Sequence, residues 1–163
     1  MKLAMILLGA AVLTSCGVSL HPFYTAANLS DDPTLAGAWS DEDSTWTVKH
    51  TGFGKYTIEF CDRDDCTIDA VATLFEAGGQ QYVDFQENPA FFSDAVRLHG
   101  LFQLQRMGTD RLEISLLETE RMQGVVDHLE IEGRFLLTAS PEWLQTEVLR
   151  AGYFGEGHLL KRN

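Results

Sequence analysis

The chain has 163 residues, with 24 Asp and Glu against 12 Lys and Arg, which gives a net charge of −12 at pH 7. Such an acidic surface repels nucleic acid and anionic headgroups, and no basic cluster interrupts it, so we expect no nucleic-acid partner. The length is that of one domain with a sizeable core. The charge also opposes self-association, which predicts a monomer.

The N-terminus has the organisation of a secretory signal. Lys2 supplies a positive charge, residues 3–12 form an apolar run, and small residues lead to a cysteine. The apolar run is shorter than the ~20 helical residues that a transmembrane segment needs. The segment Leu13-Thr14-Ser15-Cys16 resembles the lipobox of bacterial lipoproteins. This resemblance implies that residues 1–15 are a removed signal peptide and that Cys16 carries a lipid.

The same resemblance implies export and a lipid anchor in a bacterial membrane, on its periplasmic face. Gly17 follows the cysteine, where aspartate is associated with inner-membrane retention in enteric bacteria, so an outer-membrane location is favoured in a Gram-negative cell. Loss of Lys2 with the signal changes the net charge to −13. Residues 16–33 show no sustained period and end in turn-forming residues, which predicts a lipidated tether before a domain over 34–163.

Alternation of apolar and polar residues dominates after residue 40. Alternating segments surround Trp46, Tyr56, Phe102 and Ile114, and turn-forming residues lie between them at 51–54, 77–79 and 107–110. Each segment is typical of a strand with one solvated face, and their spacing predicts a meander of antiparallel hairpins. Residues 67–76 are apolar on both faces, which predicts a strand that is covered on its outer side as well.

The C-terminal part predicts one helix and a last strand. Ser140-Pro141-Glu142 combines a capping hydroxyl, a proline at the first helical position and an acidic residue near the positive helix end. Leu144, Val148 and Ala151 keep helical spacing, and Gly152 is a stop signal. Residues 158–162 then form a plausible final strand.

Cys61 and Cys66 are the two cysteines that remain beside Cys16. Export places them in an oxidising compartment, where a pair this close predicts a disulfide at a hairpin end. The aspartates between them leave a metal site as an alternative, but the glycine and the distant glutamate of a calcium loop are missing, so we predict no metal. Direct pairing of the cysteines needs either a bulge in the register or a twisted hairpin tip.

Gly37 and Trp39 form the G-x-W of lipocalin-like barrels, and the last predicted strand carries Arg162. Residues 34–163 are similar to a group of uncharacterised bacterial lipoproteins with lipocalin-like (calycin) character, through residues 35–39, 73–79, 82–85, 136–140 and 160–162. The resemblance implies a mainly β fold, an antiparallel up-and-down β-barrel with one C-terminal α-helix before the last strand. It also implies that Trp39 closes the barrel base, with Arg162 stacked over it.

Catalytic motifs are missing from the sequence, which has no nucleophile elbow, Walker loop, H-E-x-x-H or G-x-G-x-x-G. We therefore predict no catalytic residue and no cofactor, and we favour a protein that is not an enzyme. His128, Glu130 and Glu132 form a polar row that could bind zinc or manganese, although a solvated strand face explains the alternation and is favoured.

Two long connections supply the candidate contact residues. Phe91 and Phe92 are adjacent in the connection over 87–94, where they either plug a barrel end, gate a cavity, or contact a membrane or partner. Met122 lies in a second connection over 118–124 that could frame the same entrance. Arg97 and His99 share the polar face of one predicted strand, so they either orient a ligand in the interior or, as we favour, face solvent.

Three functions are compatible with these features of the sequence. The leading hypothesis is a membrane-anchored protein that binds a small apolar or amphipathic ligand in its barrel, because eight-stranded barrels are either filled or sized for one small ligand. The alternative is a structural or assembly lipoprotein whose solid barrel binds another envelope protein through its loops. An envelope enzyme would require distant histidines and carboxylates to converge.

Overall fold

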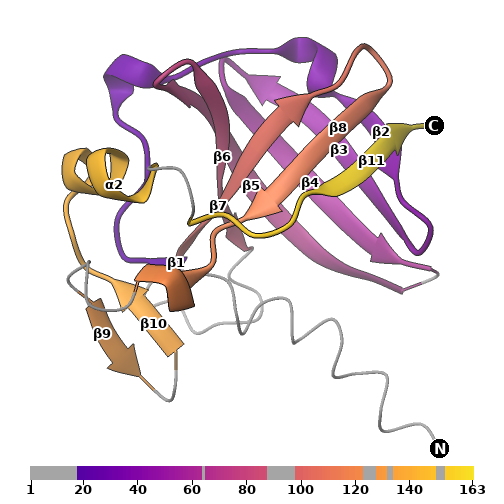
Figure 1. The fold of residues 1–163 in the computed structure, drawn as a ribbon. Coiled ribbons are helices and arrows are strands. Elements are labelled where there is room, and N and C mark those ends of the chain that lie inside the picture. Colours follow the sequence, from indigo (N-terminus) through magenta and orange to yellow (C-terminus); the bar gives the residue numbers. More distant parts are fainter. Residues whose placement is uncertain (1–17, 64, 88–97, 123–127, 132–133, 150–152) are drawn as a thin grey trace, which may run out of the picture.

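Eight strands of the described residues close into an antiparallel barrel (Figure 1). The computed structural model describes residues 18–63, 65–87, 98–122, 128–131, 134–149 and 153–163. The barrel strands are β2 (Gly37–Ser40), β3 (Ser44–Gly52), β4 (Lys55–Asp62), β5 (Asp65–Ala77), β6 (Gln80–Glu87), β7 (His99–Arg106), β8 (Arg111–Leu116) and β11 (His158–Arg162). Strands β2 to β8 pair in chain order, and β11 pairs between β8 and β2. The predicted up-and-down barrel is confirmed.

A small sheet and a helix cover one side of the barrel wall (Figure 1). Strand β1 (Val18–Ser19) pairs antiparallel with the start of β7 and parallel with β10 (Arg134–Leu137), which pairs with β9 (His128–Ile131). Helix α2 (Pro141–Val148) begins at Ser140, whose side chain accepts a hydrogen bond from the Trp143 backbone N–H. The predicted helix before the last strand is confirmed, while Ala151 and Gly152 lie outside the described residues. Within the described ranges, no helix is long and apolar enough to span a membrane.

The barrel wall separates two hydrophobic cores. The inner core fills the barrel and contains Trp39 and Leu74, whereas the outer core lies between the wall and α2 and contains Phe75 and Leu144. Leu74 and Phe75 are neighbours in β5, and successive side chains of a strand point to opposite faces. Both are fully buried, so the predicted double coverage of this strand is confirmed at these positions.

The Cys61–Cys66 disulfide is present at the β4–β5 turn. The register of the two strands shifts between Phe60, which pairs with Ile68, and Cys61, which pairs with Cys66. This irregularity confirms the bulge, one of the two alternatives that the sequence left open. Because the closed ring is short, the chain-entropy estimate of the stabilisation is only about 2 kcal/mol.

Residues 18–35 pack along the barrel rather than serving as a free linker, and we call this segment the strap. It includes β1 and the short 3-10 helices η1 (Ala26–Asn28) and η2 (Pro33–Leu35). Phe23 is fully buried in the outer core, and Leu35 is buried in the inner core. The prediction of a tether over 16–33 therefore differs from the structure, because one aromatic side chain and its backbone contacts bind this aperiodic segment to the wall.

Carboxylates fasten the C-terminal part of the strap. Asp31 accepts hydrogen bonds from the Gly54 backbone N–H at 2.7 Å and pairs with His50 Nε2 at 2.8 Å. The Gly54 contact, and secondarily the His50 contact, lower the pKa of Asp31 below its usual 3.8. The next residue, Asp32, forms an ion pair with Arg106 at 2.7 Å.

We expect the strap to loosen in acid. A lowered pKa in the folded state contributes stability that is present above the unfolded value of 3.8 and is lost as the pH falls through the folded value. Asp31→Asn should therefore make the stability less dependent on pH below 3.8. Acid titrations followed by near-ultraviolet circular dichroism, with Glu42→Gln in an exposed turn as control, measure this; identical titration curves for Asp31→Asn and wild type would contradict it.

Candidate functional site

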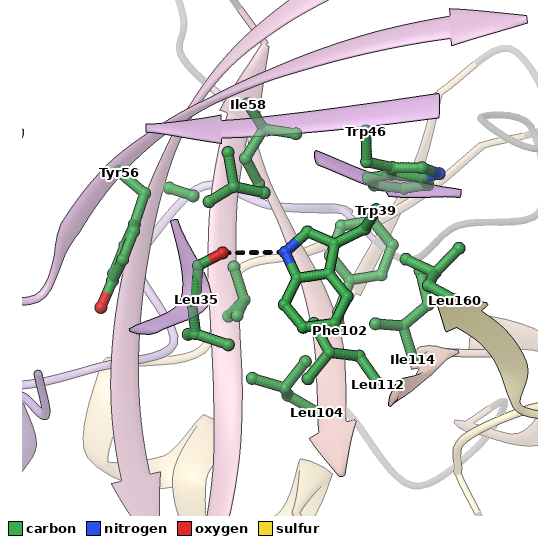
Figure 2. A pocket seen from close by; sticks show the side chains of 13 residues that line it. Leu35, Trp39, Trp46, Tyr56, Ile58, Phe102, Leu104, Leu112, Ile114 and Leu160 are labelled. Atoms are coloured by element: carbon green, nitrogen blue, oxygen red, sulfur yellow. Dashed lines mark hydrogen bonds between the residues drawn. The ribbon is translucent and has the colours of Figure 1, made fainter. Parts of the chain in front are cut away.

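The two ends of the barrel are built differently, and one of them is closed. The indole Nε1 of Trp39 donates a hydrogen bond to the Leu35 carbonyl oxygen at 2.8 Å, which fixes η2 across the base of the inner core (Figure 2). The guanidinium carbon of Arg162 lies 4.7 Å from the centre of the Trp39 ring. The base is thus sealed by a cation–π contact, in the arrangement that the lipocalin resemblance implies.

Gly37 permits this close approach. Its φ is +142°, a backbone conformation that side chains disfavour, and a Cβ there would lie 3.4 Å from the Arg162 guanidinium. The three residues of the predicted barrel-closing motif, Gly37, Trp39 and Arg162, therefore meet at one end of the barrel, which we call the closed end.

The described residues make no such closing contact at the opposite end of the barrel, which we call the open end. It is lined by four partly buried aromatic side chains, which we call the mouth cluster: Trp46, Phe60, Phe85 and Phe102. The Trp46 ring lies edge-on to Phe60 at 5.0 Å and to Phe102 at 5.9 Å. Phe85 stacks on Phe102 at 4.3 Å. Aromatic rings that remain partly exposed around a barrel opening offer flat apolar surfaces to an incoming ring or chain.

An apolar cavity of about 60 Å³ lies in the barrel, with its lining shown in Figure 2. Trp46 and Phe102 of the mouth cluster line it together with residues of the inner core such as Ile58 and Leu160. A buried apolar cavity of roughly 150 Å³ binds benzene. The cavity as it stands admits only the tip of an organic molecule, and the rest would lie against the mouth rings.

Acidic turns surround part of the open end. The β2–β3 turn exposes Asp41, Glu42 and Asp43, and Asp62 is exposed at the end of β4. Arg63 pairs with Asp43 at 3.4 Å, but both side chains are largely exposed, and such pairs contribute little. The local charge disfavours an anionic group at this rim and favours a neutral or cationic one.

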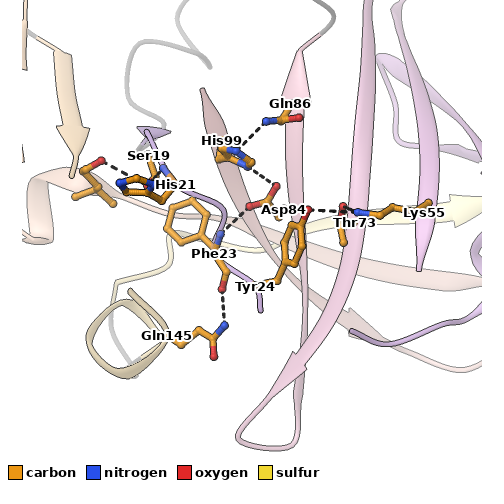
Figure 3. Close-up of polar contacts among 11 residues, drawn as sticks. Ser19, His21, Phe23, Tyr24, Lys55, Thr73, Asp84, Gln86, His99 and Gln145 are labelled. Carbon is orange, nitrogen blue, oxygen red and sulfur yellow. Dashed lines mark hydrogen bonds and ion pairs between the residues drawn. The ribbon is translucent and has the colours of Figure 1, made fainter. Parts of the chain in front are cut away.

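His99 lies on the outer face of the wall and is buried beneath the strap (Figure 3). Its Nδ1 lies 2.8 Å from Asp84 Oδ1, and its Nε2 lies 2.8 Å from the Gln86 amide nitrogen. The other oxygen of Asp84 accepts a hydrogen bond from the Phe23 backbone N–H at 2.8 Å. The prediction that His99 faces solvent is therefore wrong, and the ring does not line the interior either, because the strap covers this part of the wall.

The other candidate contact residues do not line the mouth in the described part of the chain. Met122, in the 3-10 helix η4 (Thr119–Met122), is fully buried in the outer core, so it is not part of an exposed contact patch. Phe91, Phe92 and Arg97 lie outside the described residues, as does Cys16. Among the described residues, no group of three His, Cys, Asp or Glu side chains could hold a metal ion.

Sequence reasoning did not identify the mouth cluster. Its four residues point inward from four different strands. The alternation of apolar and polar residues in these strands predicted only that each strand has one buried face. The available signal is that Trp46 and Phe60 lie beside one end of a predicted hairpin, opposite the 51–54 turn.

Comparisons of the chain with protein-family models, with curated proteins and with solved structures returned no match.

Proposed function

We propose that this protein is an exported bacterial lipoprotein, anchored through Cys16, that binds a small apolar or amphipathic molecule at the open end of its barrel. The observation that supports ligand binding is the mouth cluster, whose side chains remain partly exposed beside an apolar cavity. Leaving four aromatic side chains partly in water costs free energy that a bound apolar group would recover, at roughly 25 cal/mol per Å² removed from water.

The size of the cavity limits the ligand. Ligand pockets commonly enclose roughly 300–1,000 Å³, whereas this cavity has about 60 Å³. A haem or a large steroid does not fit the inner core as it is packed. This volume favours a single chain or ring that places its tip in the cavity and lies against the exposed faces of the mouth rings.

The charge of the rim limits the polar end of the ligand. A carboxylate held at the mouth would lie near the exposed acidic turn over 41–43. We therefore favour a neutral or cationic head, such as a hydroxyl, an ester or an amine, over a free fatty acid.

A quenching titration tests this function. In the Trp143→Phe variant with Cys16→Ser, a terminally brominated medium-chain alcohol should quench the emission of Trp46 and Trp39, which both line the cavity. Phe60→Ala should weaken binding about fivefold, since one aromatic contact contributes roughly 1 kcal/mol. The matched control is Val71→Ala, an exposed residue on the outer face of β5.

Two results would contradict the proposal. One is a titration without saturable quenching, and the other is an equal loss of affinity in Val71→Ala and Phe60→Ala. The corresponding brominated fatty acid should bind more weakly than the alcohol, and this difference should shrink at high salt because the charges of the rim are screened.

The small cavity favours one alternative, a structural lipoprotein that binds another envelope protein. In that case the mouth cluster would be covered by a protein surface instead of a small molecule. The alternative predicts no saturable quenching by the brominated alcohol and a Phe60-dependent complex with a defined envelope protein.

A further inference from the structure

The predicted lipid attachment site is close to the mouth of the barrel. Strand β1 starts at Val18, two residues after Cys16. An extended chain spans at most ~3.6 Å per residue, so the Cα atom of Cys16 lies within about 7 Å of that of Val18. The strap thereby leaves almost no free linker between the lipid and the barrel.

Val18 itself is a neighbour of the open end. It pairs with Gly100 in β7, and Gly100 in turn pairs with Phe85 of the mouth cluster. The Phe85 ring covers Gly100 so closely that a Cβ at this position would overlap with it. The strand that follows the lipid is thus hydrogen-bonded to the rim of the mouth, and the closed end lies at the far end of β7.

We propose that the lipid holds the open end of the barrel against the bilayer, so that the ligand enters from the membrane. This inference rests on the proposed function, because it needs the lipid on Cys16. The exposed surface beside β1 then contacts the bilayer. An apolar ligand that leaves the bilayer would reach the mouth cluster without crossing water.

The exposed residues around the mouth agree with this orientation. Leu129 is 52% exposed on β9, in the small sheet that also contains β1. The acidic turns lie beside β3 and β4, and β3 is four strands from β7 in the closed barrel order, which is the opposite side of the mouth. Contact on the β7 side therefore places an apolar side chain at the bilayer and keeps the acidic turn over 41–43 and Asp62 away from phosphate groups.

The closed end provides the matched comparison. Phe53 lies in the β3–β4 turn at the closed end and is 66% exposed. Phe53 and Leu129 are both exposed apolar residues, so each tolerates tryptophan. If exposed apolar surface alone drove membrane contact, Phe53 would be the better candidate. If the anchor decides the orientation, Leu129 contacts the bilayer and Phe53 does not.

The experiment uses the full lipidated chain in vesicles of zwitterionic lipid that contains phosphatidylcholine brominated near the headgroup. Two reporters, Leu129→Trp and Phe53→Trp, are placed in a Trp46→Phe, Trp143→Phe background, where buried Trp39 gives a constant signal. We expect loss of emission for Leu129→Trp and no loss for Phe53→Trp. The same variants with Cys16→Ser should show no loss in either case.

Two outcomes would overturn the proposal. Quenching of Phe53→Trp equal to or greater than that of Leu129→Trp would place the closed end at the membrane, and no quenching of either reporter in floating vesicles would place the barrel away from it. If the protein does not float with the vesicles and its mass shows no lipid, both the orientation and the anchor are overturned. The titration with brominated alcohol reports on the ligand site independently, so the two failures are distinguishable.

Discussion

Trp39→Ala is expected to lower the free energy of unfolding by about 4 kcal/mol, because truncation of a large buried aromatic side chain costs roughly 3–5 kcal/mol. Trp39 is fully buried, and its ring fills the space between η2 and the inner core. Its loss also removes the hydrogen bond to the Leu35 carbonyl oxygen and the ring under Arg162. No nearby side chain is positioned to refill the base of the barrel, since Arg162 is held by other contacts.

Arg162 shows why the base cannot simply collapse. Its guanidinium donates hydrogen bonds to the carbonyl oxygens of Thr34 at 2.5 Å and Ala36 at 2.9 Å. These contacts keep the cation outside the inner core after the ring is removed, so a cavity remains. Arg162→Lys keeps the charge but loses the planar guanidinium that lies over the Trp39 ring, and it should cost less than Trp39→Ala.

Urea unfolding followed by far-ultraviolet circular dichroism measures the effect. Trp143→Ala is the matched control, because this tryptophan lies exposed on α2, and it should cost no more than about 0.5 kcal/mol. Trp39→Phe should fall between the two, at about 1–2 kcal/mol, through loss of the indole hydrogen bond and some volume. A cost below 1 kcal/mol for Trp39→Ala would show that the base is not the stabilising contact that the geometry indicates.

The sequence predicts the barrel well because each strand carries its own signal. In β7 the predicted alternation is correct, since Phe102 faces the inner core while His99 and Gln103 face outward. The alternation cannot show what covers the outer face. The cover comes from the strap and α2, which lie far from β7 in the chain, and His99 is therefore buried although its pattern is that of a solvated residue.

The strap could not be predicted for the same physical reason. Its contacts with the wall depend on Phe23 and on side chains of other elements rather than on a period of its own. Likewise the mouth cluster exists only once the barrel closes and brings β3 and β4 near β6 and β7. The sequence determined the faces of the strands, whereas the assembly of distant elements determined which faces are covered.

Asp84→Ala is the second change with a large expected effect, at about 3 kcal/mol. Asp84 is 2% exposed and accepts a hydrogen bond from the Phe23 backbone N–H (Figure 3). It also accepts one from His99 Nδ1, because the Gln86 amide donates to the other ring nitrogen of His99. Removing the carboxylate leaves two buried donors without an acceptor, and each such group costs roughly 1–3 kcal/mol. The matched control is Glu76→Gln, at an exposed position on the neighbouring strand β5.

The effect should be concentrated in the strap. Phe23 is also held by Gln145, whose amide donates to its carbonyl oxygen at 3.1 Å, and farther along the wall Lys55 donates to Thr73 at 2.8 Å and lies over the Tyr24 ring. Of these contacts, only the one with Asp84 is a hydrogen bond that a buried carboxylate accepts from the backbone of the strap. Without it, the N-terminal part of the strap loses a buried, charge-assisted contact while the barrel strands keep their own pairing.

Limited proteolysis separates local release from global unfolding. In Asp84→Ala, cleavage within residues 18–35 should accelerate more than the unfolding of the barrel, measured by tryptophan emission in the same sample. If cleavage and unfolding accelerate equally, the carboxylate stabilises the whole domain rather than the strap. Because the strap is also the connection between the barrel and the predicted lipid, release of Phe23 would lengthen that connection by several residues. Asp84→Ala should then also reduce the bromolipid quenching of Leu129→Trp, which ties the buried network on the wall to the orientation of the mouth at the membrane.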